Sequence, residues 1–86
     1  MREIIGKVQS IEQDKHYPRL NIVIEDFCKH QFYVQVMKRD MEKAKRFKEG
    51  DIVRFEVKPV LKMVNRRDQK LFYNNLVLEE ATTVSF

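Results

Sequence analysis

Apolar residues recur at every second position in several separate runs, and this alternation constrains the fold more than any other feature of the sequence. The clearest run is Ile52–Lys58, in which Val53, Phe55 and Val57 share one parity and polar or charged residues hold most of the other. Successive side chains of a β-strand point to opposite faces, so such a run predicts a half-buried strand with an apolar inner face. The chain is therefore predicted to be mainly β.

Further runs alternate in the same way or are rich in β-prone residues, so the sequence predicts five strands. Gly6 lies in the middle of the first run, where a glycine indicates a bend or a close approach of another backbone segment. Pro59 should end the fourth run, because proline cannot donate a hydrogen bond to a central ladder. Residues 62–70 are predicted to form a basic hairpin loop, with Met63 and Val64 at its base. The predicted strands span residues 4–11, 20–24, 32–37, 52–58 and 71–78.

The spacing of apolar residues becomes helical only between Asp40 and Gly50. Met41, Ala44 and Phe47 recur at intervals of three, which places them on one side of a helix. The Asp40 side chain can cap the first backbone N–H groups, and Gly50 can adopt the left-handed conformation that follows many helices. The sequence predicts one short helix that begins after Asp40 and ends just before Gly50.

The inward parity of the strands and the apolar side of the helix together define a predicted core. It consists of Ile4, Val8, Leu20, Ile22, Ile24, Phe32, Val34, Val36, Phe47, Val53, Phe55, Val57, Leu76 and Leu78.

Length and composition limit the possible classes of protein. With 86 residues the chain is one domain, which we assign to residues 1–80, followed by a C-terminal tail at 81–86. Charged residues make up 35%, which argues against a membrane span, while 43% apolar residues are too many for a disordered tail. The single cysteine cannot form an internal disulfide, and the N-terminus shows no secretory apolar run, so we expect a cytoplasmic location.

Three strands, a short helix and a final pair of strands is the element order of the five-stranded OB-fold barrel. The sequence resembles small bacterial single-stranded-DNA-binding and primosomal-replication-type proteins of this fold in three segments, Ile4–Val8, Phe47–Val53 and Leu71–Leu76. The resemblance implies a protein that binds single-stranded nucleic acid without chemistry, with DNA favoured over RNA.

Positive charge is concentrated in one segment. Arg54–Lys70 carries six basic and two acidic residues and so accounts for the whole net charge of +4. On an OB-fold this segment borders the ligand groove, where cations contact phosphates and flat rings stack on bases. Glu25 on the same predicted face would oppose phosphate, and an outward tyrosine is often an oligomer contact instead. The predicted phosphate ligands are Arg19, Lys58, Lys62, Arg66, Arg67 and Lys70, and the predicted stacking residues are Tyr33 and Tyr73, with Tyr17 as a further candidate.

Residues suited to metal binding or nucleophilic catalysis are scarce. His16, Cys28 and His30 are the only imidazoles and thiol, and a zinc site needs three or four converging ligands. A Cys-His catalytic pair needs a third, orienting group and a pocket, and residues two apart on a strand do not provide them. No phosphate-binding loop or catalytic triad order is present. We expect no metal, no cofactor and no enzymatic activity.

A second class of function remains open at this point. Tyr33, Met37, Met63 and Val64 could instead form an interface in a protein-interaction subunit that does not bind nucleic acid. In either case we expect a homo-oligomer, most simply a dimer, because the first strand and the segment Val84–Phe86 would offer unpaired β-prone edges.

Overall fold

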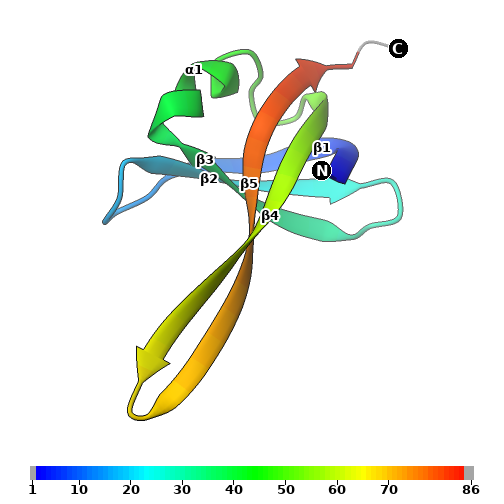
Figure 1. Ribbon diagram of the computed structural model, residues 1–86. Coiled ribbons are helices and arrows are strands. Elements are labelled where there is room, and N and C mark those ends of the chain that lie inside the picture. Colours follow the sequence, from blue (N-terminus) through cyan, green and yellow to red (C-terminus); the bar gives the residue numbers. More distant parts are fainter. Residues whose placement is uncertain (1, 85–86) are drawn as a thin grey trace.

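Five strands close into a barrel in the computed structural model, which describes residues 2–84 (Figure 1). The strand order around the barrel is β1-β2-β3-β5-β4, with one short helix between β3 and β4. The predicted fold, a mainly β five-stranded barrel of the OB type with one helix, is therefore confirmed. The elements are β1 Arg2–Gln13, β2 Arg19–Asp26, β3 Gln31–Met37, the 3-10 turn η1 Lys38–Asp40, α1 Met41–Ala44, β4 Ile52–Arg66 and β5 Gln69–Thr83.

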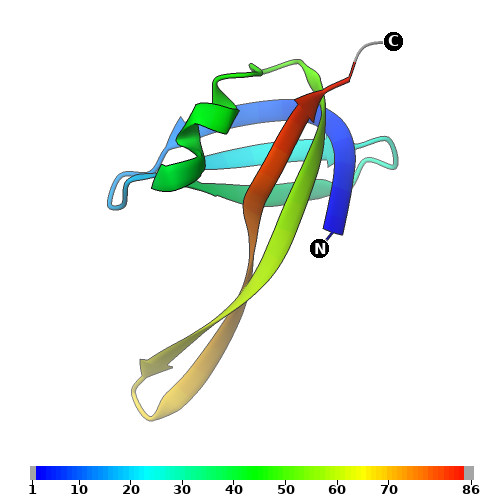
Figure 2. The ribbon, with the colours of Figure 1, turned by 45° about the horizontal axis from the view of Figure 1, so that its top comes forward.

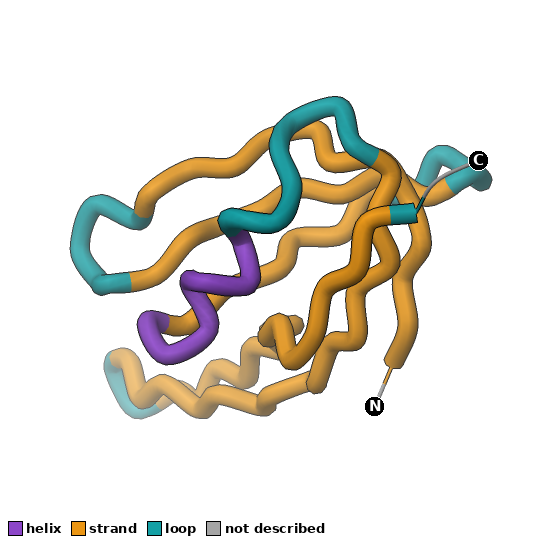
Figure 3. Tube along the Cα trace, turned by 90° about the horizontal axis from the view of Figure 1, so that it is seen from above, coloured by secondary structure: helices purple, strands orange, loops and turns teal. Residues whose placement is uncertain are grey.

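Barrel closure depends on one parallel contact. Neighbouring strands pair antiparallel, except that β3 and β5 run parallel where Val34 pairs with Leu76 and Gln35 with Val77. Figure 3 shows the closed ring from above, with the helix lying beside the strands at one side. Because pairing strands share a face, this contact makes the outer surface of β2 and β3 continuous with that of β5.

The barrel interior matches the predicted core. Of the fourteen predicted residues, eleven are buried, while Leu20, Phe32 and Leu76 are partly buried and pack against them. Phe55 is fully buried, and its ring centroid lies 5.1 Å from that of Phe47. Two small buried residues outside the predicted core also contribute to it, Ala44 on the predicted apolar side of the helix and Ala81 on β5.

The helix is shorter than predicted. α1 ends at Ala44, and the Asp40 side chain makes no cap hydrogen bond but forms an ion pair with Lys43. The Lys45 and Arg46 N–H groups bond to the carbonyls three residues earlier, both at 3.3 Å. From Gly50 the backbone bonds to β1, where the Gly50 N–H donates to the Val8 carbonyl and the Val8 N–H donates to the Asp51 carbonyl, both at 2.9 Å. Gly50 has the predicted left-handed conformation, with φ 93°, but it serves this turn and not the helix end.

Residues 62–70 are not a loop. β4 continues through Pro59 to Arg66 and β5 begins at Gln69, so Arg67 and Asp68 alone form the turn. Pro59 is tolerated because β1 pairs with β4 only as far as Val57, which leaves that edge without a ladder partner. The two strands extend beyond the barrel as a twisted ribbon, and the molecule is 51 Å along its longest axis (Figures 1 and 2). We call residues 58–75 the projecting ribbon.

The two predicted free edges are occupied. β1 pairs with β2 over residues 6–13 and with β4 over residues 2–7, so it is not an open edge of the barrel. At the other end of the chain, β5 runs to Thr83, Ala81 is buried, and the Val84 N–H donates to the Ile52 carbonyl at 2.9 Å. Much of the segment assigned to a tail thus lies against the barrel, while residues 85–86 fall outside the described residues. Among the described residues, the projecting ribbon has no ladder partner on either outer edge.

Candidate functional site

The register of the projecting ribbon places three of its cations on one side, together with Val60, Val64 and Leu71. Lys62 pairs with Tyr73 and Arg66 pairs with Gln69, and Lys58 pairs with Val77 at the base. Pairing residues share a face and alternate residues return to it, so these side chains lie on one side. We call this side the basic face and define it by Lys58, Lys62, Arg66 and Tyr73.

The cations of the ribbon are exposed, and no ion pair engages them within residues 2–84. Arg54, by contrast, lies in the barrel part of β4 and its Nε donates to Glu3 at 2.7 Å. The positive charge predicted for this segment is therefore carried by the ribbon, where no acid of residues 2–84 forms an ion pair with it. The five ribbon cations are Lys58, Lys62, Arg66, Arg67 and Lys70.

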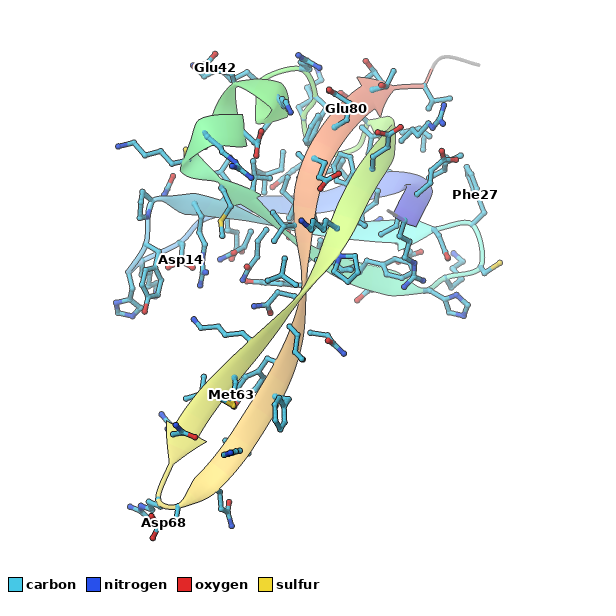
Figure 4. All side chains as sticks on the ribbon, viewed as in Figure 1. Asp14, Phe27, Glu42, Met63, Asp68 and Glu80 are labelled. Atoms are coloured by element: carbon cyan, nitrogen blue, oxygen red, sulfur yellow. The ribbon has the colours of Figure 1, made fainter. Side chains whose placement is uncertain are left out.

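The tip of the ribbon concentrates three of these cations around a two-residue turn. Arg67 and Asp68 both have positive φ, 46° and 65°, which is the pattern of a type I′ hairpin turn. Figure 4 shows Asp68 at the end of the ribbon, far from the barrel. Arg66, Arg67, Gln69 and Leu71 line a solvent-open hollow there. Lys70 pairs with Asn65 and so lies on the opposite face from Arg66.

The two predicted stacking residues are exposed. Tyr33 on β3 is 56% exposed and pairs with Val23, while Tyr73 is 48% exposed on the ribbon. Tyr33 and Gln35 are two residues apart on β3 and so lie on the same side of that strand. Gln35 pairs with Val77 on β5, and Val77 in turn pairs with Lys58 on β4. Tyr33 and the basic face thus belong to the same outer side of the sheet.

Arg19 is held in a different environment, at the loop between β1 and β2. Its Nε donates to Asp14 Oδ2 at 2.9 Å, and its guanidinium lies 4.7 Å from the centre of the Tyr17 ring. The His16 N–H and the Arg19 guanidinium, with other donors, hold the pKa of Asp14 well below its ordinary value. The structure therefore joins Arg19 to Tyr17 and not to the ribbon, and Asp14, which the sequence analysis did not single out, organises the loop.

The turn between β2 and β3 holds the cysteine and one histidine. Asp26 accepts hydrogen bonds from the backbone N–H groups of His30 and Cys28, and these bonds, chiefly that from His30, lower its pKa. Within residues 2–84 no group of three His, Cys, Asp or Glu side chains is placed to hold a metal ion, and no helix is long and apolar enough to cross a membrane. Glu25 lies close to Lys29, at 3.9 Å, which reduces the repulsion that it would exert on a phosphate.

The other side of the ribbon carries residues that the sequence analysis did not assign to a face. Leu61, Met63 and Phe72 are 63%, 52% and 59% exposed, and Met63 pairs with Phe72. We call this side the apolar face and define it by Pro59, Leu61, Met63 and Phe72. The signal for it was present in the sequence, because the inward parity of Val53, Phe55 and Val57 continues through these positions.

Comparisons with known proteins support the fold. No family model matches the chain, and no curated protein matches it. Among solved structures, the mitochondrial single-stranded DNA-binding protein Rim1 of S. cerevisiae matches with a TM-score of 0.70 and 15% identity, covering 96% of this chain and 90% of that one. A selenomethionine-labelled crystal of the same protein gives a TM-score of 0.69, 14% identity and coverage of 96% and 92%. The predicted fold-level resemblance to single-stranded-DNA-binding proteins is confirmed.

Proposed function

We propose that this protein binds single-stranded nucleic acid, with DNA favoured over RNA, and performs no chemistry on it. The observation that carries the proposal is the projecting ribbon, whose five cations lack acidic partners among the described residues, on a barrel that shares its fold with the single-stranded DNA-binding protein Rim1 of S. cerevisiae. Unpaired surface cations attract a polyanion, and each phosphate contact releases counterions from the strand.

The outer side of the sheet supplies both kinds of contact that a single strand needs. Lys62 lies opposite Tyr73, so a phosphate contact and a stacking ring are neighbours on the ribbon. Tyr33 extends the same side onto the barrel. Arg66 and Arg67 would hold the strand at the tip. Lys70 and Arg19 complete the proposed set from less favourable positions, since Lys70 lies on the other face and Arg19 is already paired with Asp14.

Salt dependence tests the electrostatic part. Fluorescence anisotropy with a labelled single-stranded DNA, repeated with RNA, should show affinity falling linearly as salt rises on logarithmic axes. The double variant Arg66→Ala, Arg67→Ala should weaken binding to every sequence and flatten this slope by about 0.7 for each lost contact. The matched control is Lys38→Ala, Lys48→Ala, which removes the same charge from exposed positions away from the ribbon. It should leave the slope nearly unchanged.

Stacking has a different signature. Tyr33→Ala or Tyr73→Ala should weaken binding by about 1 to 3 kcal/mol without changing the salt slope, because a ring releases no counterions. Replacement by phenylalanine should leave the affinity close to that of the wild type. Wild-type binding weaker than about 100 µM at about 50 mM salt, where non-specific electrostatic binding normally registers, would contradict the proposal. Equal losses in the Lys38 and Lys48 control would show that net charge and not the ribbon governs binding.

A further inference from the structure

The apolar face of the projecting ribbon is the feature that nucleic-acid binding leaves unexplained. Leu61, Met63 and Phe72 each expose more than half of their surface. Met63 and Phe72 are direct cross-strand neighbours, and Figure 4 shows Met63 on the part of the ribbon that lies beyond the barrel. Three large apolar side chains on one side of a two-stranded ribbon form a patch and not a scatter of single residues.

This face is the continuation of the barrel interior. Val57 pairs with Leu78 inside the core, and the next inward pair is Pro59 with Leu76. Within the barrel the other strands cover these positions, but no other described element covers Leu61 or Phe72. A two-stranded ribbon on its own is only marginally stable in water, and it becomes stable when one apolar face is buried. Something of matching chemistry should therefore lie against this face.

The distribution of charge selects the occupant. Residues 59, 61 and 63 of β4 and residues 72, 74 and 76 of β5, which alternate onto this face, carry no charge, and Lys70 at the tip is the one ribbon cation on this side. A phosphate backbone or an acidic peptide would find only Lys70 there, since Lys58, Lys62 and Arg66 point to the other side. The same face of a second copy offers uncharged surface along these six positions. In an antiparallel, two-fold arrangement the basic tips also lie at opposite ends.

We propose that the apolar face packs against the same face of a second copy, so that two ribbons form a small sandwich with both basic faces outward. Four steps of about 3.3 Å along each strand and two strands about 4.8 Å apart make the face about 13 Å by about 10 Å. That is roughly 130 Å² in projection, well below the accessible area of about 800 Å² per partner in a standard stable complex. The dimer should therefore be weak and depend on protein concentration.

Sedimentation velocity on the full chain, without nucleic acid, tests this interface. Across about 10 µM to 1 mM, a range that spans weak interfaces, the wild-type mass should rise from that of the 10.4 kDa monomer toward twice that value. The variant Met63→Ser, Phe72→Ser should remain monomeric throughout. The matched control Val60→Ser, Val64→Ser removes apolar groups from the opposite side of the same strand and should dimerise like the wild type.

Specific results would overturn the proposal. A wild-type protein that stays at 10.4 kDa throughout has no such interface. A Met63 and Phe72 variant that dimerises like the wild type places the interface elsewhere. Loss of DNA affinity in that variant, with the wild type monomeric, assigns the face to nucleic acid instead. If circular dichroism shows that the double variant is unfolded, the single variant Leu61→Lys replaces it. This substitution puts a charge in the centre of the face, and the variant should remain monomeric in the same sedimentation experiment. Because the sedimentation experiment contains no nucleic acid, its outcome does not depend on whether the protein binds nucleic acid.

Discussion

Replacing Gly6 with alanine should destabilise the barrel through a single steric contact. Gly6 lies in β1 between two partners, Asp26 on β2 and Val53 on β4. A Cβ atom at this position would lie 2.2 Å from the Glu25 carbonyl oxygen and 2.7 Å from the carbonyl carbon. The obstacle is backbone within a strand ladder, so no side chain can rotate away to make room.

The size of the effect follows from the distance that must be recovered. Ordinary contact begins at 3.4 Å, so the Glu25 carbonyl must move by more than 1 Å relative to β1. Forcing an extra methyl group into a packed site costs about 1 to 3 kcal/mol. Loss of a ladder hydrogen bond at the start of the β1–β2 pairing adds about 1 kcal/mol. We expect Gly6→Ala to lower the free energy of unfolding by about 2 to 4 kcal/mol, out of a total of about 5 to 15 kcal/mol.

Urea unfolding followed by circular dichroism measures this difference, and Gly50→Ala is the matched control. Gly50 has φ 93° and open space where its Cβ would lie, so its substitution tests backbone conformation without a clash. That change should cost about 1 to 2 kcal/mol. A clash at Gly6 should also speed amide exchange at Cys28 and His30, whose N–H groups bond to the neighbouring Asp26 carboxylate. If Gly6→Ala costs no more than Gly50→Ala, the close approach of β1 and β2 does not limit stability.

Two further substitutions test the core and the loop between β1 and β2. Phe55→Ala removes a fully buried ring and should lower the free energy of unfolding by about 3 to 5 kcal/mol; an unchanged urea midpoint would contradict the strand parity. Asp14→Asn should destabilise the protein at neutral pH, because the His16 N–H and Arg19 favour the charged carboxylate and depress its pKa in the folded state. The difference in the free energy of unfolding between the wild type and Asp14→Asn should reach its maximum above about pH 4, the ordinary aspartate pKa. It should become smaller as the pH falls below that value. A difference that persists at low pH would assign the effect to something other than the charge of Asp14.

The barrel could be predicted because its strands obey one rule throughout. In Val53, Phe55 and Val57 the alternation coincides with β-branched or aromatic side chains, so local preference and burial agree. Gly6 was predicted to mark a bend or a close backbone approach, and the closeness of the Glu25 carbonyl confirms the second alternative. In these elements the pattern within each short segment was sufficient to predict the structure.

The helix was predicted too long because its end is decided by a distant strand. Met41, Ala44 and Phe47 have helical spacing, and Ala44 and Phe47 are indeed buried, but the backbone after Ala44 turns. The Lys45 and Arg46 N–H groups bond only three residues back, and at Gly50 the backbone bonds to Val8, about forty residues earlier in the chain, which no local spacing can indicate. A tight turn and a long-range contact with β1 therefore stand where the last turns of the helix, and its end at Gly50, were predicted.

Residues 62–70 of the ribbon were predicted as a loop because the turn lacks the usual residues. Hairpins of this type commonly place glycine or asparagine where φ is positive, whereas this chain uses Arg67 and Asp68. Parity nevertheless predicted the outward direction of Tyr33 and Tyr73, and both are exposed. What alternation could not indicate is that Phe72 and its neighbours leave the barrel, because an apolar position on a strand is normally buried.

The two faces of the ribbon should respond to salt in opposite directions. Each ribbon carries five cations and one acid, Asp68, so two ribbons packed about 10 Å apart repel one another while their apolar faces attract. The Debye length falls from about 30 Å at 0.01 M salt to about 10 Å at 0.1 M, so added salt weakens this repulsion and should tighten the dimer. The same salt competes with phosphate binding on the basic face and should weaken nucleic-acid affinity. Sedimentation and anisotropy at the two salt concentrations separate these effects. A dimer that weakens with salt would show that ion pairs, and not Leu61, Met63 and Phe72, hold the two copies together.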